Sequence, residues 1–142
     1  MKKLTLSCLP LLLLFLSCKK EKATCDLNTT NIVGSYKATA VTYKATPSST
    51  PVDIFALSDA CDKDNIIILN TNGTFTYQDA GVKCDPASDD TGIWSLNNNV
   101  LTIGYEAGDT ESGEVKTFDC STMALTQTDS NGGVTTQTLS RQ

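Results

Sequence analysis

Histidine is absent from the 142 residues, and this absence removes several kinds of chemistry at once. A Ser-His-Asp or Cys-His catalytic device needs an imidazole to accept the proton of the nucleophile. Zinc sites commonly combine histidine with paired cysteines, and no Cys-x-x-Cys pair occurs either. Paired carboxylates, which can carry out glycoside hydrolysis, remain the catalytic alternative, but a small domain offers little groove for a polymer. We therefore predict that the protein is not an enzyme, with no catalytic residues, no metal and no cofactor.

A hydrophobic run long enough to cross a bilayer is also lacking. The apolar stretch extends from Leu4 to Leu16, roughly 13 positions, whereas a membrane span takes about 20. Lys2 and Lys3 precede it, and a short apolar stretch behind basic residues is typical of a secretory signal peptide. We expect residues 1–17 to be this signal peptide.

The end of the apolar run carries a candidate lipid attachment site. Phe15-Leu16-Ser17-Cys18 resembles the lipobox of bacterial lipoproteins, in which a hydrophobic and a small residue precede the modified cysteine. The resemblance implies that Cys18 takes a diacylglycerol through its thiol and becomes the first mature residue. Further acyl chains such as palmitate would then anchor the protein stably, which one chain would not. The alternative is an ordinary signal peptide with an incidental cysteine.

The resemblance to lipoproteins also carries an expected location. Residues 18–30 would be the lipidated cysteine and its tether, and residues 31–142 the folded domain. Surface display of some lipoproteins depends on acidic residues after the lipidated cysteine, whereas Lys19 and Lys20 follow Cys18 here. We therefore expect an anchor in the outer membrane, with the domain facing the periplasm.

Basic residues are scarce beyond the leader. Residues 23–142 hold six Lys or Arg against fifteen Asp or Glu, a net charge of −9. Nucleic acids select basic surfaces, so this balance argues against a nucleic-acid partner. Acidic loop clusters at Asp59/Asp62/Asp64 and Asp85/Asp89/Asp90 lack EF-hand spacing, and we interpret them as solvated carboxylates.

Four cysteines follow Cys18, an even number that predicts disulfides in an exported chain. Three pairings are possible. We favour Cys61–Cys84, which would join neighbouring segments, and Cys25–Cys120, which would tie the N-terminal arm to a late strand.

The rest of the chain reads as strands and turns, because apolar and polar residues alternate and Asn, Gly and Asp fill the gaps. Asn72-Gly73 is a strong hairpin signal. A long loop after the first strand contains a possible helical turn within residues 52–60. We predict an all-β fold, an eight-stranded antiparallel up-and-down barrel, with a sandwich as the alternative. Closure removes sheet edges, so a monomer is expected. The expected strands cover residues 32–43, 66–69, 74–78, 92–96, 100–105, 114–119, 123–129 and 134–140.

Several short motifs follow one another along the chain: Gly34-Ser35-Tyr36, Cys61-Asp62-Lys63-Asp64-Asn65, Asn72-Gly73-Thr74-Phe75, Cys84, Gly92-Ile93-Trp94-Ser95-Leu96, Leu101-Thr102-Ile103 and Leu125. Their order and spacing resemble the lipocalin-like domains of exported Gram-negative lipoproteins, over about residues 31–140. Two departures from lipocalins stand out: Tyr36 occupies the usual position of a tryptophan, and no helix follows the last strand. The resemblance implies a barrel whose mouth carries the long first loop and whose cup can hold a small apolar molecule.

Two functions remain open at this point. One is a membrane-tethered binding protein for a small hydrophobic or amphipathic ligand, and the other is a structural or interaction protein that presents loops to a partner in the cell envelope. A ligand would be held by inward-facing apolar and small residues, which in a packed barrel would instead fill the interior. The candidates for lining the cup are Tyr36, Ala38, Ala40, Phe75, Tyr77, Trp94, Leu101 and Ile103.

Overall fold

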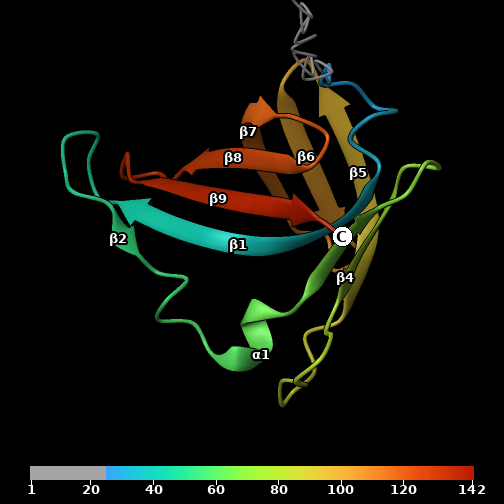
Figure 1. Cartoon of the computed structure of the whole chain (residues 1–142), viewed down its shortest axis with the longest axis horizontal. Coiled ribbons are helices and arrows are strands. Elements are labelled where there is room, and N and C mark those ends of the chain that lie inside the picture. The colour runs from blue at the N-terminus through green and yellow to red at the C-terminus, as the bar shows by residue number, and fades with distance from the viewer. Residues whose placement is uncertain (1–24) are drawn as a thin grey trace, which may run out of the picture.

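A computed structural model describes residues 25–142 of the chain. It contains almost no helix, as predicted, and its strands follow one another along the chain (Figure 1). The elements are β1 (Gly34–Lys44), β2 (Val52–Asp53), α1 (Ala60–Lys63), β3 (Ile66–Leu69), β4 (Thr74–Gln78), β5 (Asp90–Asn97), β6 (Val100–Tyr105), β7 (Thr110–Phe118), β8 (Thr122–Thr128) and β9 (Val134–Arg141).

The strands form a closed, antiparallel, up-and-down barrel. From β3 to β9 each strand pairs with the next in sequence, and β1 pairs with both β3 and β9. Eight strands therefore make the wall, and β2 adds two residues to the outer part of β1. The predicted barrel is confirmed. A sandwich would require crossings between sheets, and every wall connection in the described residues joins neighbours.

The connections divide the barrel into two ends. We call the end that carries the N-terminal segment (residues 25–33) the closed end and the opposite end the open end (Figure 1). The closed end holds the short turns of residues 70–73, 98–99 and 119–121. The open end holds four loops, residues 45–65, 79–89, 106–109 and 129–133.

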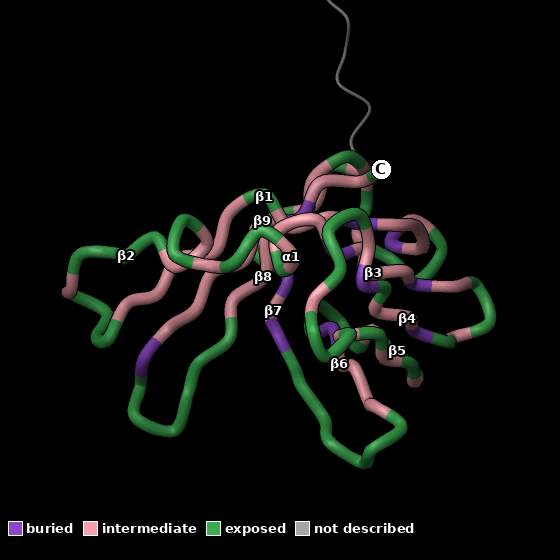
Figure 2. Tube along the Cα trace, turned by 90° about the horizontal axis from the view of Figure 1, so that it is seen from below, coloured by how far each residue is buried: buried purple, intermediate pink, exposed green. Residues whose placement is uncertain are grey.

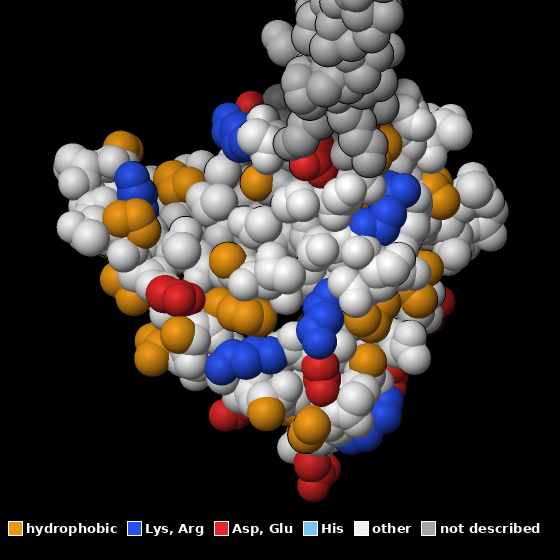
Figure 3. Space-filling view, in the orientation of Figure 1, with side chains coloured by type: hydrophobic (Ala, Val, Ile, Leu, Met, Phe, Trp, Pro, Cys, Tyr) orange, Lys and Arg blue, Asp and Glu red, His pale blue; other side chains and the backbone are white. Residues whose placement is uncertain are grey.

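Side chains of the core converge from all around the wall towards the closed end. Exposed residues gather in the connecting loops, whereas buried ones lie mostly on strands (Figure 2). On the outer face shown in Figure 3, hydrophobic side chains lie in small groups among polar ones. The buried hydrophobic residues are Ile32, Tyr36, Leu69, Phe75, Trp94, Leu101, Val115, Met123 and Leu139.

Tyr36 seals the closed end. Its side chain is fully buried, and its hydroxyl donates to the Ile32 carbonyl at 2.7 Å. The guanidinium of Arg141 donates to the same hydroxyl at 2.7 Å and lies over the ring, 5.3 Å from its centroid. Arg141 also donates to the carbonyl of Asn31, so the last strand is tied to the segment that precedes the first. The position that lipocalins give to tryptophan thus forms a closing plug here.

A β-bulge at Thr39 changes which side chains of β1 face inward. The register passes from Ala38 opposite Leu139 to Ala40 opposite Thr138, so one extra residue lies on β1. Leu139 faces the interior, and Thr138 therefore faces outward. This corrects the expectation that Ala38 and Ala40 share an inward face, because beyond the bulge Val41 takes the inward position.

Both predicted disulfides are present. Cys25–Cys120 ties the N-terminal segment to the turn between β7 and β8 at the closed end. Cys61–Cys84 joins α1 to the loop between β4 and β5 at the open end. The helical turn lies slightly later than expected, at Ala60–Lys63, where it contributes to this junction. Within residues 25–142, no helix is both long and apolar enough to cross a membrane.

Candidate functional site

A cavity of about 160 Å³ lies inside the barrel. It is formed by the inward positions of six strands, which alternate with outward residues along each strand. β5 contributes none of the lining. The lining residues are Ile67 and Leu69 of β3, Phe75 and Tyr77 of β4, Leu101, Ile103 and Tyr105 of β6, Glu111 and Gly113 of β7, Met123, Leu125 and Gln127 of β8, and Thr135, Gln137 and Leu139 of β9.

The polarity of the cavity changes along the barrel axis. On β8 the inward sequence runs from buried Met123 through Leu125 to exposed Gln127. On β9 it runs in the opposite chain direction, from Thr135 through Gln137 to buried Leu139. The deep wall is therefore apolar, and the part near the open end carries amide and hydroxyl groups. Such a gradient suits a molecule with an apolar end and a polar end.

Two aromatic rings meet in the wall of the cavity because Gly92 lies between them. Gly92 is paired with Phe75 on one side and with Tyr105 on the other. With no side chain between them, the two rings contact each other edge to face, 5.5 Å apart and at 89°. A Cβ at Gly92 would overlap the carbonyl oxygen of Gly104 on β6. The glycine is thus required both by the backbone of β6 and by the ring pair.

Tyr105 and Glu111 form a polar pair at the edge of the cavity. The Tyr105 hydroxyl donates to the Glu111 carboxylate at 3.3 Å. Burial, together with the charges of Glu111 and then Asp90, raises the pKa of Tyr105 to about 12. The phenol therefore keeps its proton at physiological pH and remains a donor. Glu111 lies opposite Ile103, so the carboxylate shares the inward face of the wall.

The rim of the cavity, where it meets the open-end loops, is held by a polar network around Asn65. Its side-chain amide donates to the Tyr77 hydroxyl at 3.0 Å and to Ser88 at 3.3 Å, and its oxygen accepts from Ala80 N at 3.2 Å. Asn65 is almost fully buried, so these bonds satisfy groups that would be costly to leave unpaired. The network fixes Tyr77 against the loop of residues 79–89.

Asp79 organises the same loop from inside. It is fully buried, and its carboxylate accepts from the backbone amides of Cys84 at 3.1 Å and Ser88 at 3.2 Å. Asp89 in turn accepts from the amide of Asp79 at 2.9 Å. Neither Asn65 nor Asp79 was predicted to be a rim-forming residue. Each follows or precedes a strand, but nothing local to the sequence indicates that the two are buried.

Four of the eight residues predicted to line the cup line this cavity: Phe75, Tyr77, Leu101 and Ile103. The other four do not. Tyr36 plugs the closed end, and Ala40 faces outward because of the bulge. Ala38 packs against the core beside Leu139.

Trp94 is the fourth exception. Its indole donates to the carbonyl of Asn70 at 2.9 Å and lines a groove of about 480 Å³ at the closed end, with Thr30 and Asn72 among its neighbours. Fluorescence of this tryptophan would thus report on the closed end rather than on the cavity. The lining residues of β7, β8 and β9 were not predicted, although Leu125 and Gln127 lie two residues apart, as do Gln137 and Leu139, and so share one face of their strand.

The cysteine and carboxylate clusters have structural partners. Cys61, Asp62 and Cys84 bring candidate ligand atoms within 4.8 Å of one another, but the two sulfurs are bonded in a disulfide and are not thiolates. In the acidic clusters, Asp64 accepts from the amide of Val82 at 2.8 Å. The expectation of purely solvated carboxylates is thereby corrected for Asp64 and Asp89, which hold the loop of residues 79–89. The predicted lipid attachment site, Cys18, lies outside the described residues.

Comparison with known proteins identifies a family. A family model described as a lipocalin-like domain matches residues 32–125, which is more than half of the chain. Among solved structures, an uncharacterized protein from Bacteroides eggerthii DSM 20697 is similar, with 12% sequence identity and a TM-score of 0.49. The similarity covers 78% of this chain and 98% of that one. No curated protein matches.

Proposed function

We propose, from the premise that the chain belongs to the lipocalin-like domain family, that its barrel binds a small amphipathic molecule. This fold is generally a non-enzymatic binding fold. The observation that carries the proposal is the internal cavity, apolar at depth and polar towards the open end. The ligand enters with its apolar end first and leaves its polar end at the mouth, beside Tyr105, Glu111 and Gln127.

The volume of the cavity limits the size of the inserted group. A cavity of about 150 Å³ lined by aliphatic and aromatic side chains holds one benzene, whereas pockets for drug-sized ligands measure about 300–1,000 Å³. The 160 Å³ available here therefore fits one ring or a short branched alkyl group. A long acyl chain does not fit without displacement of the wall.

Methyl NMR tests the proposal directly. The chain has two methionines, Met1 and Met123, and Met123 lines the cavity. We expect benzyl alcohol, added to the full chain in lipid nanodiscs, to shift the methyl signal of Met123, which an M123L variant assigns. Leu125→Phe fills the cavity from β8 and should abolish the shift. Thr126→Phe, the neighbouring outward position, should leave it intact. No saturable shift, or equal shifts in both variants, would overturn the proposal.

A second candidate function is loop-mediated binding of a protein partner in the cell envelope. Leu57 is 77% exposed and Val82 is 57% exposed, on two open-end loops that Cys61–Cys84 joins. Large apolar side chains held on a rigid frame can serve as contacts. Crosslinking from a photoreactive residue at position 57 should then capture one reproducible partner in intact cells, and Leu57→Ser should weaken its co-purification. Absence of a partner specific to position 57 would remove this candidate.

We further propose that the protein is a monomeric lipoprotein anchored in the outer membrane through Cys18 and facing the periplasm. The support is the short apolar run that ends in Leu16-Ser17-Cys18. Intact-mass measurement should show loss of residues 1–17 and addition of acyl chains to Cys18. The Cys18→Ser variant should have the mass of a chain without acyl groups and should no longer be found in the membrane fraction. An unmodified wild-type chain would contradict the anchor.

A further inference from the structure

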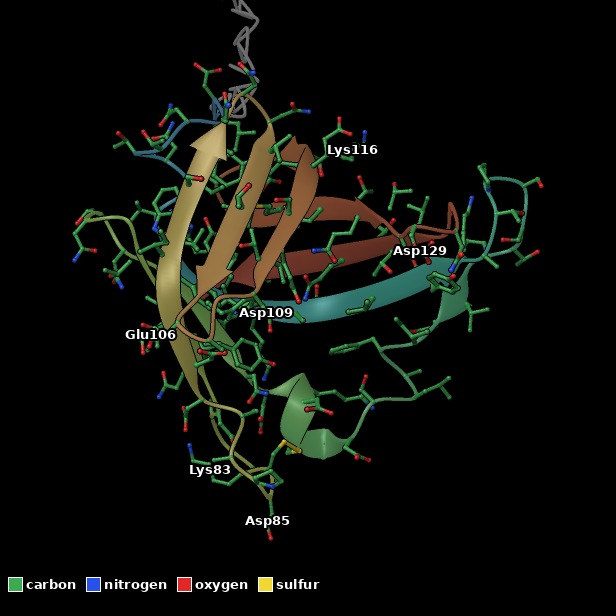
Figure 4. The ribbon with its side chains drawn as sticks, turned by 180° about the vertical axis from the view of Figure 1, so that it is seen from behind. Lys83, Asp85, Glu106, Asp109, Lys116 and Asp129 are labelled. Carbon is green, nitrogen blue, oxygen red and sulfur yellow. A yellow bond between two sulfur atoms is a disulfide. The ribbon has the colours of Figure 1, made fainter. Side chains whose placement is uncertain are left out.

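The two ends of the barrel differ in charge. The four open-end loops carry ten Asp or Glu and two lysines. Both lysines are engaged with the backbone: Lys63 donates to the Ala56 carbonyl at 3.1 Å, and Lys83 donates to the Asp79 carbonyl. Figure 4 labels Asp85, Glu106, Asp109 and Asp129 on these loops, whereas Lys116 lies towards the closed end. An approaching molecule therefore meets a negative potential at the mouth.

The inward face of the barrel repeats this asymmetry. Glu111 is the charged residue among those that line the cavity, and Asp90 lies opposite Tyr77, on the inward face near the same edge. Arg141 is the inward cation in the described strands, but it is at the closed end, where Tyr36 and Asn31 hold its guanidinium. A negative ligand would therefore place its charge beside carboxylates and away from a cation, at a cost in desolvation.

The groups around Glu111 are suited to a cation. The Tyr105 hydroxyl holds the carboxylate in place at 3.3 Å. The rings of Tyr77 and Tyr105 line the same end of the cavity, and aromatic rings can attract ammonium groups. Gln127 and Gln137 add amide oxygens that accept hydrogen bonds from an N–H donor.

We propose that the cavity selects organic amines: the apolar group of the ligand fills the space between Leu101, Met123 and Leu139, and its ammonium binds Glu111. The inference rests on the proposed binding function and narrows it to a class of ligand. It disfavours fatty acids and other carboxylates. Because Glu111 is exposed to solvent, the gain from the ion pair is small, roughly 1.5- to fivefold in affinity over a neutral analogue.

Three probes with the same ring separate the possibilities: benzylamine, benzyl alcohol and phenylacetate, titrated into the full chain in nanodiscs of neutral lipid at 0.15 M salt. The Met123 methyl shift reports binding. We expect benzylamine to bind roughly 1.5- to fivefold more tightly than benzyl alcohol, and phenylacetate to bind more weakly than both. Glu111→Gln should remove the preference, so that benzylamine and benzyl alcohol bind this variant equally tightly.

Glu114→Gln is the matched control, because Glu114 lies on the same strand and pairs with Lys116 outside the cavity. It should leave the preference for the amine intact. If benzyl alcohol binds but benzylamine gains nothing, or if Glu114→Gln abolishes the preference as Glu111→Gln does, the amine proposal is overturned and the binding function stands. If none of the three probes shifts Met123, the binding function itself is overturned, and the amine proposal with it.

Discussion

The closed and open ends of the barrel use the same kinds of residue for different purposes. At the closed end Tyr36 is fully buried between the Ile32 carbonyl and the Arg141 guanidinium. At the open end Tyr77 and Tyr105 are only partly buried and bond to Asn65 and Glu111 at the cavity edge. A tyrosine whose ring and hydroxyl are both enclosed contributes to stability, whereas one at the edge of a cavity is available to a ligand.

Removal of each disulfide should give the largest difference in stability between the two ends. Cys25–Cys120 closes a loop with a sequence separation of 95, and Cys61–Cys84 one of 23. In the chain-entropy model these lower the entropy of the unfolded chain by amounts equivalent to about 5 and about 3 kcal/mol. We expect the double serine variants to lose stability in that order in urea unfolding. A larger loss at the open end would reverse the comparison.

Truncation of one tyrosine at each end gives the next largest difference. Tyr36→Ala removes a fully buried ring and leaves Arg141 without its partner hydroxyl, so the free energy of unfolding should fall by about 3–5 kcal/mol. Tyr77→Ala removes a partly buried ring and should cost about 1–2 kcal/mol. Chemical denaturation of both variants measures this. Equal losses would mean that the open end is packed as firmly as the closed end.

Two glycines on adjacent strands test the ring pair of the cavity wall. Gly92→Ala would press a methyl group against the carbonyl oxygen of Gly104, and we expect a loss of about 2–3 kcal/mol. Gly104→Ala meets the Ile93 side chain at 3.5 Å, an ordinary contact, and should change stability by less than about 1 kcal/mol. The near-ultraviolet circular dichroism of the Phe75–Tyr105 pair should change only in the first variant. A tolerated Gly92→Ala would show that β6 can move.

The smallest expected effect concerns the titration of Tyr105. Its pKa of about 12 in the folded protein lies above the ordinary tyrosine value of 10.0, so the folded state holds the proton more tightly than the unfolded chain. This contribution is complete below pH 10 and is lost as the pH rises towards 12. Allowing for partial exposure, it amounts to about 1–2 kcal/mol. Urea midpoints at pH 9 and pH 11.5 should differ less for Tyr105→Phe than for wild type. Equal midpoint differences in the two proteins would place the Tyr105 phenol in solvent.

Much of the frame could be predicted from local patterns. The alternation in residues 74–78 and 100–105 identified β4 and β6, and Asn72-Gly73 identified the turn before β4. The cavity residues Phe75, Tyr77, Leu101 and Ile103 came from the same alternation, because inward and outward positions simply alternate within an uninterrupted strand.

Most of the strands and turns, the acidity and the scarcity of catalytic groups can be inferred from the chain alone, since each depends on residues close together or on composition. An exception is β7, which begins at Thr110 rather than at residue 114. Contacts between distant segments decide instead that Ala40 faces outward, that Trp94 lies outside the cavity and that Glu111 meets Tyr105 at its edge. One extra residue at Thr39 inverts the faces of β1, and pairing across the closed wall brings distant strands together. Neither effect leaves a periodic signal in the chain, so the pattern that predicts a barrel does not reveal which side chains meet inside it.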